Sequence, residues 1–151
     1  MRRDSGFTLI ELLIVVAIIG LIAAVAIPNL LDAIQRGKQK RTMADIRTVA
    51  TAVEAYSIDH SQPPQYPQGP ILDAMADDLQ EAHLKECPRS DGWRRPLYYA
   101  SASVDHYTIG SGGADGSVPD MSGHEGATHD LSADIVFSDG MFRQWPEGLQ
   151  E

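Results

Sequence analysis

A run of apolar residues near the N-terminus, residues 7–28, constrains the fold more than any other feature of this sequence. The run reads FTLIELLIVVAIIGLIAAVAIP and carries a single charged residue, Glu11. As a helix, about 20 apolar residues rising about 1.5 Å each cross the roughly 30 Å hydrocarbon core of a bilayer. We therefore predict a transmembrane helix over residues 7–28.

Glu11 lies close to the start of this apolar run. An ionised carboxylate within a membrane is costly unless it has a partner or lies near the interface, so such an acid indicates a function. The charged leader upstream, residues 1–6, ends in Gly6. A cut after Gly6 would create a new α-amine on Phe7, and this amine is a candidate partner for the carboxylate.

Residues 6–13, GFTLIELL, resemble the processing site of type IV pilins and of the pseudopilins of type II secretion. In these families a prepilin peptidase cuts after the glycine, here Gly6, and methylates the new N-terminal phenylalanine, here Phe7. The resemblance implies that Glu11, the fifth residue of the mature chain, meets the N-terminal amine of a neighbouring subunit during filament assembly. Pro28 falls where such proteins carry a helix-kinking proline.

The orientation of the span does not follow from charge counting. Two arginines, Arg2 and Arg3, precede it and four bases follow at residues 36–41, so the positive-inside rule would place the C-terminal part in the cytoplasm. The resemblance implies the opposite: a single pass through the bacterial inner membrane with the head in the periplasm. An ordinary secretory signal is disfavoured, because no polar cleavage site with small residues follows Pro28. A plain membrane anchor that does not assemble remains an alternative.

Beyond Pro28 the sequence favours a second, amphipathic helical part over residues 29–60. Apolar residues recur there at spacings of three and four, as at Ile46, Val49 and Val53. Because Pro28 lacks an amide hydrogen and crowds the preceding turn, we expect a kink at this position. Four prolines follow in residues 61–70, so the helix should end near residue 60.

The remaining residues, 61–151, are predicted to form a small α+β head. A short helix is expected in residues 71–83, and strands are expected at residues 97–100 and 107–110. Apolar runs on both sides of Asp139-Gly140 predict a terminal hairpin. Together these elements predict a three- or four-stranded antiparallel sheet packed on the long helix, the type IV pilin-like fold.

Composition narrows the function of the head. Residues 61–151 hold 15 acidic and 5 basic side chains, a net charge of −10, which disfavours nucleic-acid binding. Cys87 is the only cysteine, so the chain forms no intrachain disulfide. Many type IV pilins close a loop with a disulfide, so its absence favours a pseudopilin. The segment DGWRRPLYY, residues 91–99, is similar to D-P-W-G-x-P-Y-x-Y of major pseudopilins, with Gly92 and Arg94 among the departures from that pattern.

A long acidic loop, residues 110–133, is the candidate metal site. Loops of this length are usually functional or mobile, and carboxylate oxygens on a glycine-rich loop are ligands that Ca²⁺ prefers. The resemblance implies calcium held by Asp115 and Asp134. Ser132 stands where the family has another acid, with Asp130 as a possible substitute. The segment HEGATH, residues 124–129, is one residue too long for a zinc-peptidase motif.

We interpret the chain as a structural subunit of a periplasmic pilus-like filament, in the manner of type II secretion pseudopilins, and not as an enzyme. A type IV pilus subunit for adhesion or motility, with a filament at the cell surface, is the alternative within this architecture. A membrane-anchored periplasmic binding domain or enzyme is the alternative of another class. The resemblance implies as partners further copies of the chain, a prepilin peptidase, other pseudopilins, an inner-membrane platform protein and a cytoplasmic ATPase.

Overall fold

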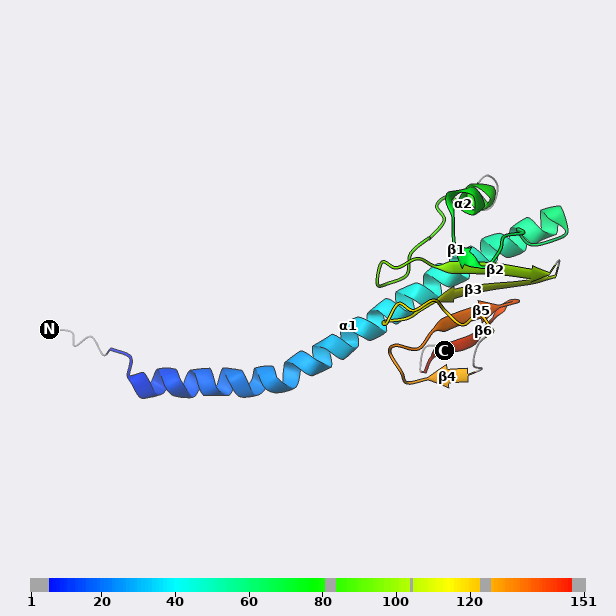
Figure 1. The fold of residues 1–151 in the computed structure, drawn as a ribbon. Coiled ribbons are helices and arrows are strands. Elements are labelled where there is room, and N and C mark those ends of the chain that lie inside the picture. The colour runs from blue at the N-terminus through cyan, green and yellow to red at the C-terminus, as the bar shows by residue number, and fades with distance from the viewer. Residues whose placement is uncertain (1–5, 81–83, 104, 123–125, 148–151) are drawn as a thin grey trace. The chain divides into compact units, whose positions relative to one another are not determined.

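The computed structural model describes residues 6–80, 84–103, 105–122 and 126–147. Contacts within the chain divide it into two units, Met1–Ile34 and Gln35–Glu151, and the helix α1 runs through both. The elements in chain order are α1 (Leu9–His60), β1 (Gly69–Pro70), α2 (Asp73–Gln80), β2 (Tyr98–Ser103), β3 (His106–Ser111), β4 (Gly126–Thr128), β5 (Ile135–Ser138) and β6 (Met141–Pro146) (Figure 1).

The first unit consists of the apolar part of α1. Its large apolar side chains are exposed on all sides of the helix, from Phe7 at 78% to Ile34 at 46%. The most apolar 18-residue window has a mean hydropathy of 3.0 and contains no buried residue, which makes α1 long and apolar enough to cross a membrane. The helix continues through Pro28. The kink expected at Pro28 stays a prediction.

In the second unit, α1 presents one face to the core. Ile46, Val49 and Val53 are fully buried on this face, as their helical spacing predicts. The helix ends at His60, and Ser61 takes a left-handed conformation with φ of 60°, a common way to end a helix. The proline-rich segment that follows cannot continue the helix.

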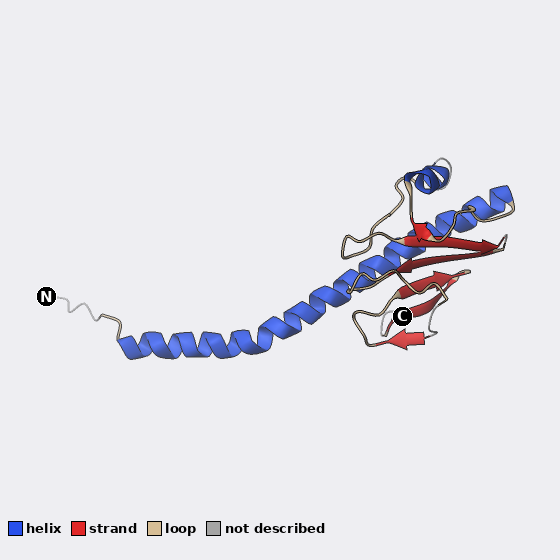
Figure 2. Cartoon of the chain, in the orientation of Figure 1, coloured by secondary structure: helices blue, strands red, loops and turns tan. Residues whose placement is uncertain are grey.

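The sheet has six strands in the order β1-β2-β3-β5-β6-β4. All neighbouring strands are antiparallel except β4 and β6, which are parallel. Our prediction of three or four antiparallel strands was therefore too low, because two- and three-residue strands extend the sheet at both edges. The α+β fold class itself is confirmed, and Figure 2 shows the strands gathered beside α1.

The predicted terminal hairpin is present between β5 and β6. Ser138 pairs with Met141, so Asp139 and Gly140 form the two-residue loop, and both have positive φ, 49° and 89°. This is the conformation that suits a right-twisted hairpin and explains the Asp-Gly sequence. The Asp139 carboxylate also accepts a hydrogen bond from the Tyr107 amide, which joins the loop to β3.

The core of this unit lies between α1 and the sheet. Tyr99 of β2, Ile109 of β3 and Ile135 of β5 are fully buried and belong to the same cluster as the buried face of α1. From α2, Met75 and Leu79 add to this cluster.

Candidate functional site

The predicted processing residues lie immediately before α1. Gly6 and Phe7 are both exposed, and a Cβ atom added at Gly6 would meet no atom within 4 Å. The fold of the chain therefore does not itself require glycine at this position. A requirement for glycine would have to come from a partner, such as the peptidase that the motif implies.

Thr8 and Glu11 form a capping box at the start of α1. The amide and the hydroxyl of Thr8 donate to Glu11 Oε2 at 2.9 Å and 2.7 Å, and the Glu11 amide lies 3.3 Å from the Thr8 hydroxyl oxygen, which accepts from it. This reciprocal pair satisfies backbone donors that a helix otherwise leaves without partners. Our sequence analysis overlooked Thr8, although the T-x-x-E spacing was there to indicate it.

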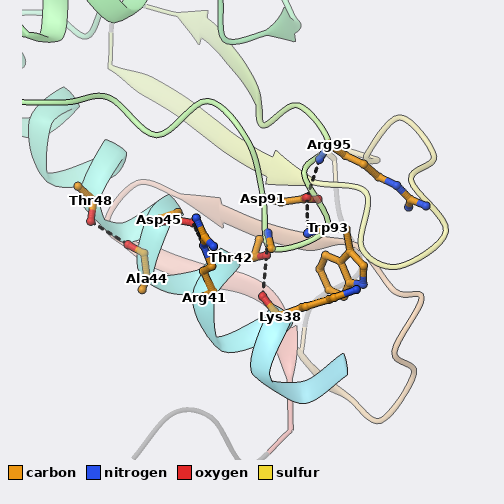
Figure 3. A network of polar contacts seen from close by, with 10 residues as sticks. Lys38, Arg41, Thr42, Ala44, Asp45, Thr48, Asp91, Trp93 and Arg95 are labelled. Atoms are coloured by element: carbon orange, nitrogen blue, oxygen red, sulfur yellow. Dashed lines mark hydrogen bonds and ion pairs between the residues drawn. The ribbon is translucent and has the colours of Figure 1, made fainter. Parts of the chain in front are cut away.

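A turn at residues 91–95 is organised by a buried carboxylate. Asp91 is only 2% exposed, and its Oδ1 accepts from the amides of Trp93 and Arg95 at 2.8 Å and 2.9 Å (Figure 3). Its Oδ2 accepts from the hydroxyl of Ser111 at 2.8 Å. Both carboxylate oxygens are thus satisfied, as a buried charge requires, and the turn is fixed to the end of β3.

The same turn is bound to α1 by two further hydrogen bonds. The Gly92 amide donates to the Thr42 hydroxyl at 2.9 Å, and the Trp93 indole donates to Gln35 at 2.7 Å. A Cβ atom at Gly92 would lie 2.3 Å from the carbonyl oxygen of Lys38, so only glycine permits this close approach. The turn therefore lies directly against the N-terminal end of the second unit's part of α1.

Arg94 in this turn has a left-handed backbone, with φ of 64°, and is exposed. Such a conformation is uncommon for a residue other than glycine and points to a constraint or a function. The similar segment of major pseudopilins has glycine at this place, so the departure noted in the sequence has a backbone consequence.

Arg95 connects the turn to the acidic loop. Its guanidinium donates to the carbonyl oxygen of Gly113 at 3.1 Å. Gly116, with φ of 72°, lies so close that a Cβ atom there would be 2.3 Å from the Nη1 atom of Arg95. Figure 3 shows the Arg95 side chain extending away from the turn toward this loop. The glycine-rich segment is thus wrapped closely around a fixed positive charge.

Two of the three predicted calcium ligands, Asp115 and Asp134, interact electrostatically, because the charge of Asp115 raises the pKa of Asp134. Partial burial raises the pKa of Asp134, and the negative charges of Asp115 and Asp120 raise it further. Asp134 Oδ2 accepts from the Asp120 amide at 2.9 Å, and Asp115 Oδ1 accepts from the Ser117 amide at 2.8 Å. These carboxylates concentrate negative charge that a divalent cation would neutralise, and their oxygens suit Ca²⁺.

Asp130, the third predicted ligand, is engaged elsewhere. Its carboxylate accepts from the amide and the hydroxyl of Ser132 at 2.9 Å and 2.6 Å, and these bonds lower its pKa. Among the described residues, no group of three or more His, Cys, Asp or Glu side chains is placed to hold a metal ion. Calcium therefore stays a prediction. The carboxylate of Asp120 accepts from the amide and the hydroxyl of Ser122 at 3.0 Å and 2.6 Å, as that of Asp130 does from Ser132, and its negative charge contributes to the raised pKa of Asp134.

The HEGATH segment falls partly outside the described residues, since His124 and Glu125 are not among them. His129 is described and forms an ion pair with Glu147.

Comparison with known proteins finds two family models, and the boundary between them falls where the sequence predicts the change from the apolar to the amphipathic part of the long helix. Residues 1–27 match the prokaryotic N-terminal methylation motif, and residues 29–134 match the family of type II secretion system protein G. The type II secretion system core protein G of Vibrio cholerae is 30% identical over 127 residues, which cover 77% of this chain and 86% of the relative. That of Pseudomonas aeruginosa is 30% identical, covering 76% and 89%. That of Aeromonas hydrophila is 29% identical, covering 80% and 92%. No solved structure matches the chain.

A methylation motif, one long apolar helix and an α+β head built on the second part of that helix define the class of type IV pilin-like proteins. Within this class, the chain belongs to the type II secretion system protein G family, and it is a pseudopilin. The resemblance drawn from the sequence is thereby confirmed.

Proposed function

We propose that this pseudopilin is the repeating subunit of a periplasmic filament, held before assembly in the inner membrane by a single pass with its head in the periplasm. The observation that supports this most is the first part of α1. Its large apolar side chains are exposed on all sides, so lipid or neighbouring helices must cover them. A head packed against one face of this helix would leave most of its apolar surface in water.

Assembly needs a contact that lipid cannot replace. Lipid tails solvate leucine and isoleucine as well as a neighbouring helix does, so the hydrophobic effect alone does not favour leaving the membrane. Glu11 can supply such a contact. Its carboxylate is held at the start of α1 by Thr8, next to the position where processing after Gly6 would expose a charged amine on Phe7. We place the function in this assembly and not in catalysis by the head.

We also propose that the acidic loop binds calcium. Asp115 and Asp134 would provide carboxylate oxygens, and backbone carbonyl groups of the loop would complete the set. The raised pKa of Asp134 supports this, because partial burial and the negative charges of Asp115 and Asp120 disfavour its ionised form more than the hydrogen bond from the Asp120 amide favours it. When bound, the cation would supply charge neutralisation and a cross-link within the loop. With or without the cation, the Arg95 guanidinium holds the loop by its hydrogen bond to the carbonyl oxygen of Gly113.

The test of the assembly role compares two substitutions of Glu11 in cells that carry the secretion machinery. Glu11→Ala removes both the cap and the charge, whereas Glu11→Gln keeps a hydrogen-bond acceptor for Thr8 and removes only the charge. We expect both variants to be processed, as a gel shift would show, and to stay in the membrane without forming sedimentable filaments. Asp32→Asn, which neutralises another exposed acid of the first unit, is the control and should assemble. Normal filament yield from Glu11→Gln would exclude charge pairing.

A further inference from the structure

A cluster of basic side chains lies where α1 enters the second unit. Residues 29–41 hold four bases and one acid, whereas residues 61–151 hold 15 acids and 5 bases. Arg36 and Lys40 are four residues apart, hence on one side of the helix, and both are exposed. Arg41 is set apart from them, because it forms an ion pair with Asp45 at 3.5 Å.

The turn at residues 91–95 adds a further base to this region. The hydrogen bond from Trp93 to Gln35 and the close approach of Gly92 to Lys38 fix the turn against the same part of α1. Arg94 is exposed at this turn in a left-handed conformation that glycine would adopt more easily. The chain thus keeps an arginine here despite an unfavourable backbone.

We name this group the basic collar, consisting of Arg36, Lys38, Lys40 and Arg94. Within the described part of the chain, none of these four side chains forms an ion pair. Of the acids near the collar, Asp91 is buried with both oxygens bonded and Asp45 is paired with Arg41, whereas the exposed Asp32 lies one helical turn before Arg36. The collar therefore carries an excess of positive charge, four bases against this one acid, on a head that is otherwise acidic.

The position of the collar along the chain indicates what it meets. Arg36 follows Ile27, the last residue before Pro28, by nine residues, or about 13 Å of helix at about 1.5 Å each. The headgroup region extends roughly 5–7 Å beyond the hydrocarbon core, and surface charges act over a Debye length of about 8 Å. A helix that spans the membrane with residues 7–28 and continues to residue 40 thus holds Arg36 within this distance of lipid phosphates, and Lys40 lies one further turn, about 6 Å, beyond it.

We propose that the basic collar binds the headgroups of anionic phospholipids at the periplasmic face of the membrane, with Trp93 at the interface between the lipid and the head. The charge complementarity is direct, and a half-buried tryptophan with its indole N–H bonded is the kind of side chain that is enriched at membrane interfaces. The binding orients the head before assembly and is lost when the subunit leaves the bilayer. This inference rests on the proposed membrane anchoring.

The experiment uses the full chain in vesicles made of equal amounts of phosphatidylglycerol and phosphatidylcholine. Trp145→Phe leaves Trp93 as the only tryptophan, because the chain has two. Quenching of Trp93 is compared between vesicles with brominated phosphatidylglycerol and vesicles with brominated phosphatidylcholine. We expect stronger quenching by the anionic lipid, and an excess that shrinks as salt is raised.

The variant Arg36→Gln/Lys40→Gln/Arg94→Gln should abolish that excess. Each neutralised base should lower the local enrichment of the anionic lipid by up to about fivefold, the factor that corresponds to roughly 1 kcal/mol per base near an anionic surface. Lys85→Gln, which neutralises an exposed base elsewhere on the head, is the matched control and should keep the excess. An unchanged melting curve for the triple variant would verify that it folds.

Flotation of the chain with the vesicles distinguishes a failure of the membrane anchoring from a failure of the basic collar as a lipid site. A chain that does not float with the vesicles would contradict the membrane anchoring itself. A chain that floats, but whose Trp93 is quenched equally by both lipids or by neither, would overturn the basic collar as a lipid site and leave the anchoring intact. An excess that survives in the triple variant would overturn it as well, as would an excess that Lys85→Gln also removes.

Discussion

The Gly92 amide donates a hydrogen bond to the hydroxyl of Thr42 at 2.9 Å, across 50 positions of sequence. The same hydroxyl donates to the carbonyl oxygen of Lys38 at 2.9 Å. Thr42 is fully buried, so this side chain both satisfies its own helix and ties the turn at residues 91–95 to α1 (Figure 3). This bond and the bond from the Trp93 indole to Gln35 hold the turn against α1.

Thr42→Val tests the bond, because valine keeps the volume and removes the hydroxyl. The Gly92 amide would lose its partner in a buried place, which costs about 1–3 kcal/mol. We expect the melting temperature of the chain in detergent micelles to fall by roughly 4 °C or more.

Thr48→Val is the matched control for this substitution. Thr48 makes the same hydrogen bond to the carbonyl four residues earlier, at 2.9 Å, but is exposed and, among the residues that the structure describes, bonds nothing outside its helix. We expect its melting temperature to change little. Equal effects of the two substitutions would show that the threonine matters only to the helix, and would remove Thr42 as the link to the turn.

Arg94→Gly should stabilise the head. A non-glycine residue in the left-handed region costs about 1–2 kcal/mol, and the greater unfolded-state entropy of glycine offsets about half of this. We therefore expect a gain of up to about 1 kcal/mol in the free energy of unfolding, measured by urea denaturation. Arg94→Ala keeps the Cβ atom and removes the charge, so it should give no such gain. A stabilisation of the same size by alanine would attribute the effect to charge and not to the backbone.

Much of this fold follows from patterns that are local in sequence. The two parts of α1 were predictable because one is apolar all round and the other has a single apolar face. The end of the helix was predictable from the prolines that follow His60. The hairpin followed from Asp139-Gly140, since few sequences tolerate two positive φ angles in succession.

The sequence did not indicate the edge strands β1 and β4. They are two and three residues long and lie in segments rich in proline and glycine, so their pairing depends on the strands beside them and not on their own propensity. The same holds for the candidate site. The contact of Arg95 with Gly113 joins segments 18 residues apart, and no spacing rule predicts it. Thr8 was missed for another reason. The T-x-x-E spacing of a capping box is local in sequence, but Glu11 was interpreted only as a residue that pairs with the N-terminal amine.

Gly116→Ala tests how closely the acidic loop is wrapped around Arg95. Alanine at φ of 72° carries a backbone cost of about 1–2 kcal/mol, and its Cβ atom would displace the guanidinium. We expect faster amide hydrogen exchange across residues 110–122 and a lower melting temperature. Arg95→Met, which keeps an unbranched apolar stem without the guanidinium donors, should speed exchange in the same residues.

Gly126→Ala serves as the control for the backbone cost of that change. Gly126 also has a positive φ, 123°, but a Cβ atom there would meet no atom within 4 Å. Gly126→Ala should lower the melting temperature without changing hydrogen exchange at residues 110–122. Exchange in that segment that is unaffected by Arg95→Met would contradict the role of the arginine as the anchor of the loop.

Asp134→Asn is expected to have opposite effects with and without calcium. Burial and the charges of Asp115 and Asp120 raise the pKa of Asp134 above its ordinary value, so the folded chain holds this proton more tightly than the unfolded chain. Stability from this group is therefore complete below the ordinary aspartate pKa and is lost as the pH rises through the raised pKa. At neutral pH the ionised Asp134 is a cost, which asparagine removes while keeping an oxygen for the Asp120 amide. In chelator, Asp134→Asn should thus melt at a higher temperature than the parent chain, with the difference vanishing in acid.

In millimolar Ca²⁺ the parent chain should gain stability and Asp134→Asn should not, because asparagine lacks the charge that attracts the cation. Asp130→Asn should leave the calcium response in place, because the negative charges that raise the pKa of Asp134 are those of Asp115 and Asp120. A parent chain whose melting temperature is the same in calcium and in chelator would rule out a stabilising calcium site in this loop.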